Sequence, residues 1–334
     1  MKRGTFALSL FAAAALPRPA RATGGLDVGE TINAVSVRVL LAGGEFAEPE
    51  RLDSWRFGWS GRTYRGTYST ITLEDGRRGL LNTVPIDAYL YGVLGAEISA
   101  GWPAAAQQAQ SVAARTFALS KLRPEKSYDV VAGDADQHYG GIEAESIEGR
   151  DAVDATSGTI MTYAGVRAHV AFSACCGGRT ADAGDVWGTP YPYLISKVCA
   201  NCAQAPGFSW RGEVPLQSIA RPLDLDKIGE LESVGLRAAD GSGRPKALNF
   251  TGAGGSVDVP MRQFRSVAGG AVVRSTFVRE ASLDERAGIV AVAGTGRGHG
   301  VGLCQWGAKG MAANGAGPDE ILAFYFPGIG FGHV

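Results

Sequence analysis

The stretch YLYGVLGAEISAGWPAAAQQAQSVAARTFALSK, from Tyr89 to Lys121, predicts two helices with one carboxylate between them. The first helix opens at Pro85, carries apolar residues on one face, and is expected to end at Gly95. The second helix starts at Trp102-Pro103 and stops before Pro124, because proline cannot continue a helix. Glu97 therefore falls in the junction, where it is suited to act as a general acid or, alternatively, serves only as a solvated or helix-capping glutamate.

Strand patterns dominate the chain before these helices. Residues 34–42 and 63–73 alternate between apolar and polar side chains, and the turn sequence EDGRRG follows the second of them. We therefore expect an α+β fold: a mixed, largely antiparallel sheet with a few helices around a cleft. Residues 203–290 are expected to form a β-rich insert lobe on the same body, so that residues 23–334 make one composite domain.

The first 22 residues have the pattern of a secretory signal peptide. A basic start at Lys2 and Arg3 precedes an apolar run, and Ala20-Arg21-Ala22 offers a cleavage site. We therefore expect the mature protein in the periplasm, in the cell wall or secreted. No later run approaches the about 18 apolar residues that a membrane span needs, and a net charge of −1 provides no electrostatic footprint for nucleic acid.

Four ordered sequence blocks resemble the SpoIID/LytB family, named for stage II sporulation protein D and an amidase enhancer. The first block is YLYGVLGAEI with WP and AQSVAARTFAL, around Glu97. The others, in the family's order, are DADQHYGG, then HVAFSACCGGRT, then GRGHGVGLCQWGAKGMAANG. Together the blocks cover nearly the whole chain after the signal peptide.

This resemblance implies a peptidoglycan lytic transglycosylase with a glycan-binding cleft. Such an enzyme cleaves the bond between N-acetylmuramic acid and N-acetylglucosamine in glycan strands, preferably denuded of peptides, and leaves a 1,6-anhydro end. The family's single catalytic acid falls on Glu97. The implied partners are glycan strands and a cell-wall amidase. A non-catalytic glycan-binding protein or amidase enhancer is the alternative, and sporulation and general wall remodelling are both open.

Seven further residues are candidates for binding the glycan. Gln137 and Tyr139 either contact the sugar or form a polar turn with a half-buried tyrosine. Arg115 either binds a carboxylate of the substrate or pairs with an acid of the protein. His299 either binds sugar or fixes its own glycine-rich loop through the main chain. The resemblance implies a cleft position for Ser173 and Thr180. The full set is Arg115, Gln137, Tyr139, Ser173, Thr180, His299 and Gln305.

Cysteines gather in the second half of the chain, at Cys175-Cys176 and at Cys199 and Cys202, with Cys304 apart. The spacing of His169, Ser173 and Cys176 resembles an HxxxSxxCxGxT pattern of zinc-containing family members. A structural zinc ion held by His169, Cys176, Cys199 and Cys202 is one interpretation. A disulfide between the two cysteine pairs is the other, because export favours oxidation. The role of Cys304 is open.

Overall fold

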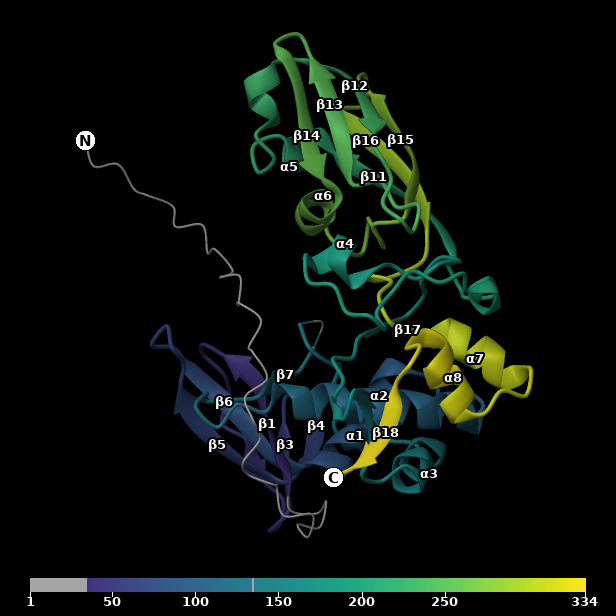
Figure 1. The fold of residues 1–334 in the computed structure, drawn as a ribbon. Coiled ribbons are helices and arrows are strands. Elements are labelled where there is room, and N and C mark those ends of the chain that lie inside the picture. Colours follow the sequence, from purple (N-terminus) through teal and green to yellow (C-terminus); the bar gives the residue numbers. More distant parts are fainter. Residues whose placement is uncertain (1–34, 134) are drawn as a thin grey trace.

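The computed structural model of the protein describes residues 35–133 and 135–334, and these form an α+β fold with mostly antiparallel sheets. The expected signal peptide lies outside the described residues. Within the described ranges, no helix combines the length and apolar character needed to cross a membrane. Figure 1 shows two parts, an upper one made mainly of strands and a lower one that holds most of the helices.

A four-stranded sheet opens the lower part, in the order β5-β6-β1-β7. Strand β1 pairs antiparallel with β6 and parallel with β7. The strands are β1 (Ser36–Gly43), β5 (Thr67–Thr72), β6 (Arg78–Pro85) and β7 (Val130–Val131). A small sheet beside it consists of β2 (Glu50–Arg51), β3 (Arg56–Trp59) and β4 (Arg62–Arg65). The strand expected over 63–73 is thus two strands, separated at Gly66, whose φ of 87° breaks the extended chain.

Helix α1 (Ile86–Glu97) follows β6 directly and packs against α2 (Ala104–Lys121) and α3 (Ile147–Ala155). It ends two residues later than the sequence predicts, so that Glu97 is its last residue. Gly95 serves packing rather than helix termination, because a Cβ there would collide with the carbonyl oxygen of Ala144. Buried residues of α1 share one core with the inward residues of β1, Val37 and Val39.

The end of the chain returns to the lower part and packs on α2. Helices α7 (Gln305–Ala313) and α8 (Pro318–Tyr325) both contact α2, and Figure 1 shows them side by side. Strand β17 (Leu303–Cys304) pairs in parallel with β10 (Phe172–Ser173). A third small sheet has the order β18-β8-β9 and consists of β8 (Thr159–Tyr163), β9 (Val166–Arg167) and β18 (Gly330–His333).

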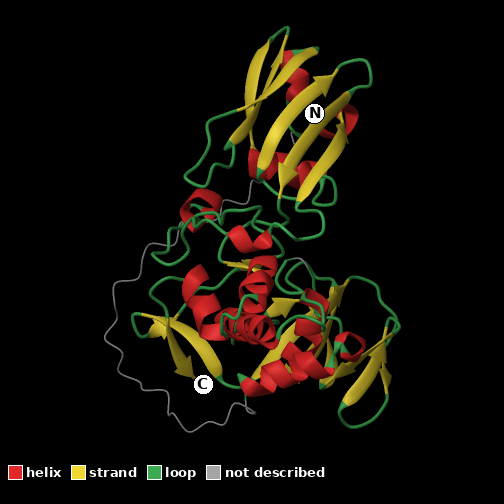
Figure 2. Ribbon diagram, turned by 90° about the vertical axis from the view of Figure 1, so that its right-hand side faces the viewer, coloured by secondary structure: helices red, strands yellow, loops and turns green. Residues whose placement is uncertain are grey.

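The upper part has a hydrophobic core of its own, formed by side chains between Trp210 and Val292. Two three-stranded antiparallel sheets enclose it, in the orders β11-β16-β15 and β12-β13-β14. The strands are β11 (Ser209–Pro215), β12 (Leu231–Leu236), β13 (Ala247–Gly252), β14 (Gly255–Pro260), β15 (Val278–Asp284) and β16 (Ile289–Thr295). The short helices α5 (Leu216–Ile219) and α6 (Met261–Ala268) complete it, and Figure 2 shows this strand-rich part set apart from the helices below.

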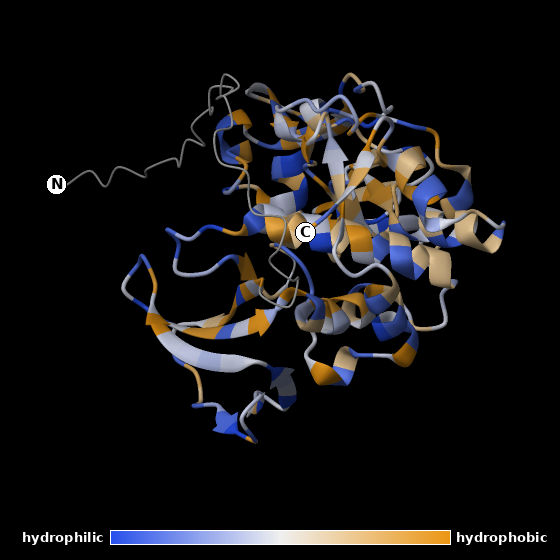
Figure 3. Cartoon of the chain, turned by 60° about the horizontal axis from the view of Figure 1, so that its bottom comes forward, coloured by the Kyte–Doolittle hydropathy of each residue, from blue (hydrophilic) through white to orange (hydrophobic). Residues whose placement is uncertain are grey.

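The connection between the two parts carries helix α4 (Ala183–Trp187) and the short 3₁₀ helix η3 (Ala200–Cys202). A hydrophobic core that contains all five cysteines lies here, against α2, α7 and α8. In Figure 3 the helices of the lower part carry both hydrophobic and hydrophilic residues, as expected of elements with one buried side and one exposed side.

Candidate functional site

Glu97 is held by two segments that are remote from it in the sequence. Its Oε1 accepts a hydrogen bond from the backbone N–H of His138 at 2.9 Å, and its Oε2 accepts one from Nε2 of Gln305 at 3.1 Å. His138 belongs to the loop after β7, whereas Gln305 is the first residue of α7. The carboxylate is partly buried, so it is fixed in direction while still reaching the surface.

Close packing of glycines brings the His138 loop against α1. The N–H of Gly140 donates to the carbonyl of Gly92 at 3.2 Å, and a Cβ on Gly92 would press into the Tyr139 ring. The start of α7 is fixed independently, because Trp306 packs edge-on against Trp102 with ring centroids 5.2 Å apart. Both partners of Glu97 therefore sit on well-packed supports.

A cavity of about 690 Å³ lies next to the segments that hold Glu97, and Glu97 itself is not among its lining residues. Ala96 lines it immediately before Glu97, and His138 lines it beside the N–H that binds Glu97. Its volume lies in the range of small-molecule binding sites. A ligand in the cavity would therefore contact residues on either side of the hydrogen bond that holds Glu97.

Of the seven expected binding residues, only Gln305 contacts Glu97. Tyr139 lines the cavity with its ring, but its hydroxyl is directed away and donates to Oδ1 of Asn82 at 3.1 Å. Burial raises the pKa of Tyr139, so the hydroxyl remains a neutral donor. The ring is thus available at the cavity edge, whereas the hydroxyl is not.

Arg115 and Gln137 lie in the core and do not reach the cavity. Arg115 is fully buried and pairs with Asp87 at 3.0 Å, with further bonds to backbone carbonyls. Burial lowers the pKa of Arg115 and the Asp87 charge partly opposes this, so the ion pair forms part of the protein's own structure. Gln137 is also fully buried and accepts a hydrogen bond from Tyr89 at 3.1 Å. The geometry agrees with the structural alternative for Arg115, and it places Gln137 in the core.

Ser173, Thr180 and His299 bond the protein's own main chain. The Ser173 hydroxyl accepts from the N–H of Gly300 at 3.2 Å, and the Thr180 hydroxyl accepts from the N–H of Lys197 at 2.7 Å. Nδ1 of His299 accepts from the N–H of Val301, so Nε2 carries the proton and donates to the carbonyl of Phe172 at 2.9 Å. Burial lowers the pKa of His299 to about 4, which keeps the imidazole neutral.

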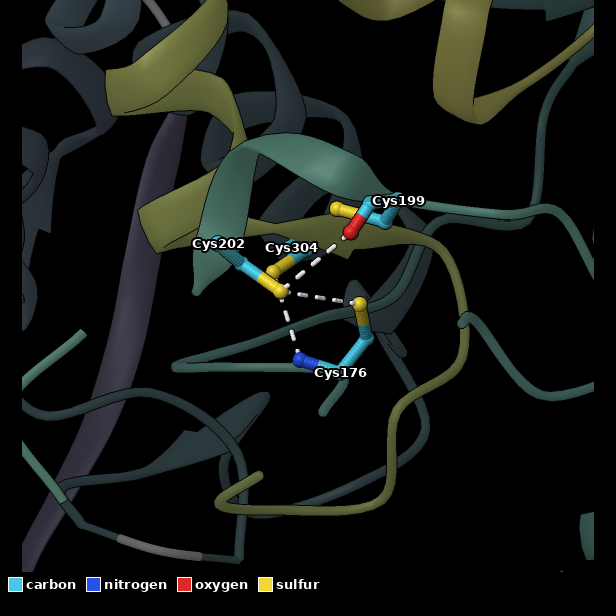
Figure 4. Close-up of side chains that lie close together, drawn as sticks. All are labelled: Cys176, Cys199, Cys202 and Cys304. Carbon is cyan, nitrogen blue, oxygen red and sulfur yellow. Dashed lines mark hydrogen bonds between the residues drawn. The ribbon is translucent and has the colours of Figure 1, made fainter. Parts of the chain in front are cut away.

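Four buried cysteines converge at the base of α7: Cys176, Cys199, Cys202 and Cys304 (Figure 4). Their sulfur atoms all lie within 4.8 Å of one another, and those of Cys176 and Cys202 are 3.7 Å apart. All five cysteines of the chain are free thiols in the structure, so the disulfide alternative is not realised in it. Hydrogen bonds from neighbouring thiols, first Cys175 and then Cys176, lower the pKa of Cys202 and favour a thiolate.

The structure corrects the expected ligand set at one position, because Cys304 belongs to the group and His169 does not. The His169 ring stacks on Tyr191 with centroids 4.8 Å apart, and its backbone N–H donates to the Tyr193 hydroxyl. Cys304 reaches the group because β17 pairs with β10, which directly precedes the loop of Cys176. Sequence spacing gave no signal for this, since the two cysteines are 128 residues apart.

The four thiols fit a tetrahedral metal ion. Zinc–sulfur bonds of about 2.3 Å place the sulfurs of a tetrahedral site roughly 3.8 Å apart, close to the observed Cys176–Cys202 separation. The Cys304 sulfur also accepts N–H bonds from Cys176 at 3.2 Å and from Gly307 at 3.4 Å. Such bonds stabilise a ligating thiolate. These residues could therefore bind a metal.

Known proteins similar to this chain include stage II sporulation proteins, an amidase enhancer and an uncharacterized protein. The family model described as stage II sporulation protein matches residues 74–163. An uncharacterized protein of Brachyspira hyodysenteriae is 33% identical over 278 residues, which cover 82% of this chain and 73% of the relative. The amidase enhancer of Bacillus subtilis is 28% identical, covering 72% of this chain and 39% of the enhancer. Stage II sporulation protein D of Bacillus amyloliquefaciens is 25% identical, covering 75% of this chain and 74% of the relative.

Proposed function

The chain belongs to the SpoIID family, which gives it a cell-wall-related role, and from this premise we propose that it is a peptidoglycan lytic transglycosylase. The substrate is the glycan strand, cleaved between N-acetylmuramic acid and N-acetylglucosamine. The names of the relatives support action outside the cytoplasm, in sporulation or in wall remodelling.

The observation that carries the proposal is the fixed direction of the Glu97 carboxylate, which His138 and Gln305 hold next to residues that line the cavity. Most glycosidases need two carboxylates, one to protonate the leaving oxygen and one to act as nucleophile or to activate water. A transglycosylase can use one carboxylate twice. The side-chain amide of Gln305 supports both states of Glu97, because it offers an N–H donor to the carboxylate and a carbonyl acceptor to the acid.

In the first half of the reaction, the protonated Glu97 donates its proton to the glycosidic oxygen, and the bond from that oxygen to C1 of the muramic acid breaks. In the second half, the carboxylate of Glu97 takes the proton from the 6-hydroxyl of the same sugar while O6 bonds to C1. The products are a free 4-hydroxyl on one strand and a 1,6-anhydro end on the other, and Glu97 is again protonated.

A second candidate function is supported by the similarity to the amidase enhancer of Bacillus subtilis. A protein that binds glycan and assists a cell-wall amidase would use the same cavity without needing the acidity of Glu97. The two functions differ in whether any glycosidic bond is broken.

We also propose that the four-cysteine group holds a structural Zn²⁺ ion. Four thiolates complete a tetrahedral shell, so the site has no open position for water and serves stability rather than chemistry. Cys304 lies at the N-terminal cap of α7, and the next residue, Gln305, binds Glu97. A metal ion in this group would thus fix the start of α7, from which Gln305 binds the carboxylate of Glu97.

Mass spectrometry of the products tests the enzymatic proposal. The purified protein is incubated with amidase-treated peptidoglycan, in parallel with Glu97→Gln and with the control Glu148→Gln, which removes an exposed acid on α3. Anhydromuramyl ends from the parent and the control, but not from Glu97→Gln, are the expected result. Reducing ends would instead indicate a hydrolase with a second carboxylate. Intact strands with retained glycan binding would favour the amidase-enhancer function.

A further inference from the structure

One arginine of the strand-rich upper part reaches the loop that carries Cys176. Arg244 lies in the connection between β12 and β13, where Ala239 and Pro245 form an isolated bridge. Its Nη2 donates to the carbonyl of Cys176 at 2.7 Å and to that of Arg179 at 2.9 Å. Cys176 is one of the four cysteines that could hold a metal ion. The upper part therefore contacts the metal group through a charged side chain.

This arginine is buried without a carboxylate partner. Arg244 is only 3% exposed, and its guanidinium forms no ion pair with a carboxylate among the described residues. Nη1 donates to the hydroxyl of Ser242 at 2.7 Å, so every acceptor of the guanidinium is a neutral oxygen. The Nε–H is buried and has no acceptor. Because a buried charge is strongly destabilising unless an opposite charge compensates for it, the guanidinium needs a negative group nearby.

Asp240 is the acid closest to Arg244 in the sequence, but its carboxylate is engaged in the turn. Its Oδ1 accepts from the backbone N–H groups of Ser242 and Arg244, at 2.7 and 3.0 Å, and from the Ser242 hydroxyl at 2.6 Å. The acidic groups that act electrostatically on Arg244 are Cys176, Asp240 and Cys304, in that order. The two cysteines carry charge only as thiolates, which is the form that binds a metal.

The surrounding residues leave a fitted space for the guanidinium. A Cβ on Gly300 would lie 2.4 Å from Nη2, so a larger residue at this position would displace the guanidinium. Cζ of Arg244 also lies 4.4 Å from the ring centroid of Phe277, which is buried. The cysteine loop, the glycine-rich loop of Gly300 and the Phe277 ring therefore hold the positive charge in one place.

We propose that Arg244 is the counter-charge of the metal–thiolate group, so that a bound metal ion holds the upper part against the cysteine loop. Four thiolates contribute four negative charges and Zn²⁺ contributes two positive ones, which leaves a net negative charge on the filled site. A guanidinium in dry surroundings offsets part of this charge, and the site in turn compensates the buried guanidinium. This inference rests on the proposed zinc site and extends it to the β-rich insert.

Zinc affinity tests this role. The purified parent, Arg244→Met and Arg244→Lys are each titrated with Zn²⁺ in competition with a chromophoric chelator of known affinity. We expect Arg244→Met to bind Zn²⁺ about ten- to hundred-fold more weakly than the parent, which is the usual range for residues that support metal ligands. Arg244→Lys keeps the charge but loses the planar fork, so it should recover most of the affinity.

The melting temperature with and without zinc separates the effect on the metal site from a general effect on the fold. Arg244→Met should lower the melting temperature of the zinc-loaded protein. The lowering should be much smaller in the reduced, metal-free protein, because neutral thiols offer Arg244 no compensating charge. The matched control is Arg237→Met, which removes an exposed arginine directly after β12 that pairs with Asp258. It should leave the zinc affinity unchanged.

Three results would overturn the role of Arg244. These are an unchanged zinc affinity in Arg244→Met, an affinity in Arg244→Lys as weak as in Arg244→Met, and an equal lowering of the melting temperature with and without zinc. A parent that binds no zinc would overturn the metal site itself, and this inference with it. Failure of the transglycosylase proposal is recognised separately, from the products formed on peptidoglycan.

Discussion

Replacing Arg115 by methionine distinguishes the two roles that its sequence context allows. Its guanidinium is fully buried and bonds Asp87 at 3.0 Å, the carbonyl of Thr156 at 2.8 Å and that of Val153 at 3.1 Å. Methionine keeps most of the side-chain volume but provides neither the charge nor the donors. Asp87 would then retain only its bond from the Ser157 hydroxyl, at 2.6 Å.

The expected loss of stability follows from the burial of this pair. Removing one partner of a buried ion pair costs about 3–5 kcal/mol, because the other charge is left uncompensated. The Asp87 side chain is 15% exposed and keeps its bond from Ser157, so the lower end applies, about 3 kcal/mol. For a chain of this size, each kcal/mol lowers the melting temperature by roughly 2–4 °C. Arg115→Met should therefore melt about 6–12 °C below the parent.

Circular dichroism during heating measures this loss, and titration with glycan strands at low temperature measures binding. The matched control is Arg56→Met, which removes an arginine that pairs with Asp53 at an exposed position. That pair is open to solvent, so its loss should leave the melting temperature almost unchanged. An unchanged melting temperature for Arg115→Met, combined with weakened glycan binding, would refute the structural role and indicate that Arg115 binds the substrate.

Two further predictions concern the cysteine group and His299. Metal analysis by mass spectrometry should find one zinc per chain in the parent and in Cys175→Ser, but not in Cys304→Ser, because only Cys304 belongs to the group; equal loss in both variants would contradict the assignment. Burial lowers the pKa of His299 to about 4, so the folded state favours the neutral imidazole. The contribution of His299 to the free energy of unfolding is therefore complete above pH about 6.5, the pKa of a free histidine, and is lost as the pH falls toward 4. In urea unfolding, the free energy of unfolding of the parent should fall by roughly 3 kcal/mol over this pH range, and that of His299→Gln should not show this fall. The same pH dependence in both proteins would contradict the prediction.

The helices could be predicted from the sequence because their signals are local. Pro103 and Pro124 bound the second helix, and the structure has it at Ala104–Lys121. The start of α1 after Pro85 is equally local. The predicted end of α1 at Gly95 is wrong, because the sequence alone does not distinguish a glycine that packs closely against Ala144 from a glycine that ends a helix.

The surroundings of Glu97 could not be predicted, since they depend on contacts between distant segments. His138 and Gln305 are 41 and 208 residues away from it in the sequence. Cys304 has no local signal for the same reason, because its neighbours in the cysteine group are distant in the sequence. The spacing of His169 predicts a metal ligand, but it cannot indicate that the ring stacks on Tyr191.

The hydrogen bond between Gln305 and Glu97 also determines when the site can form during synthesis and folding of the chain. Glu97 is made early in translation, but the residue that fixes its Oε2 follows 208 positions later, after the whole strand-rich upper part. A nascent chain, or a product cut short before α7, would carry the glutamate without the partner that aims it. The complete carboxylate site therefore arises only when nearly all of the polypeptide has been synthesised and has folded back on its beginning.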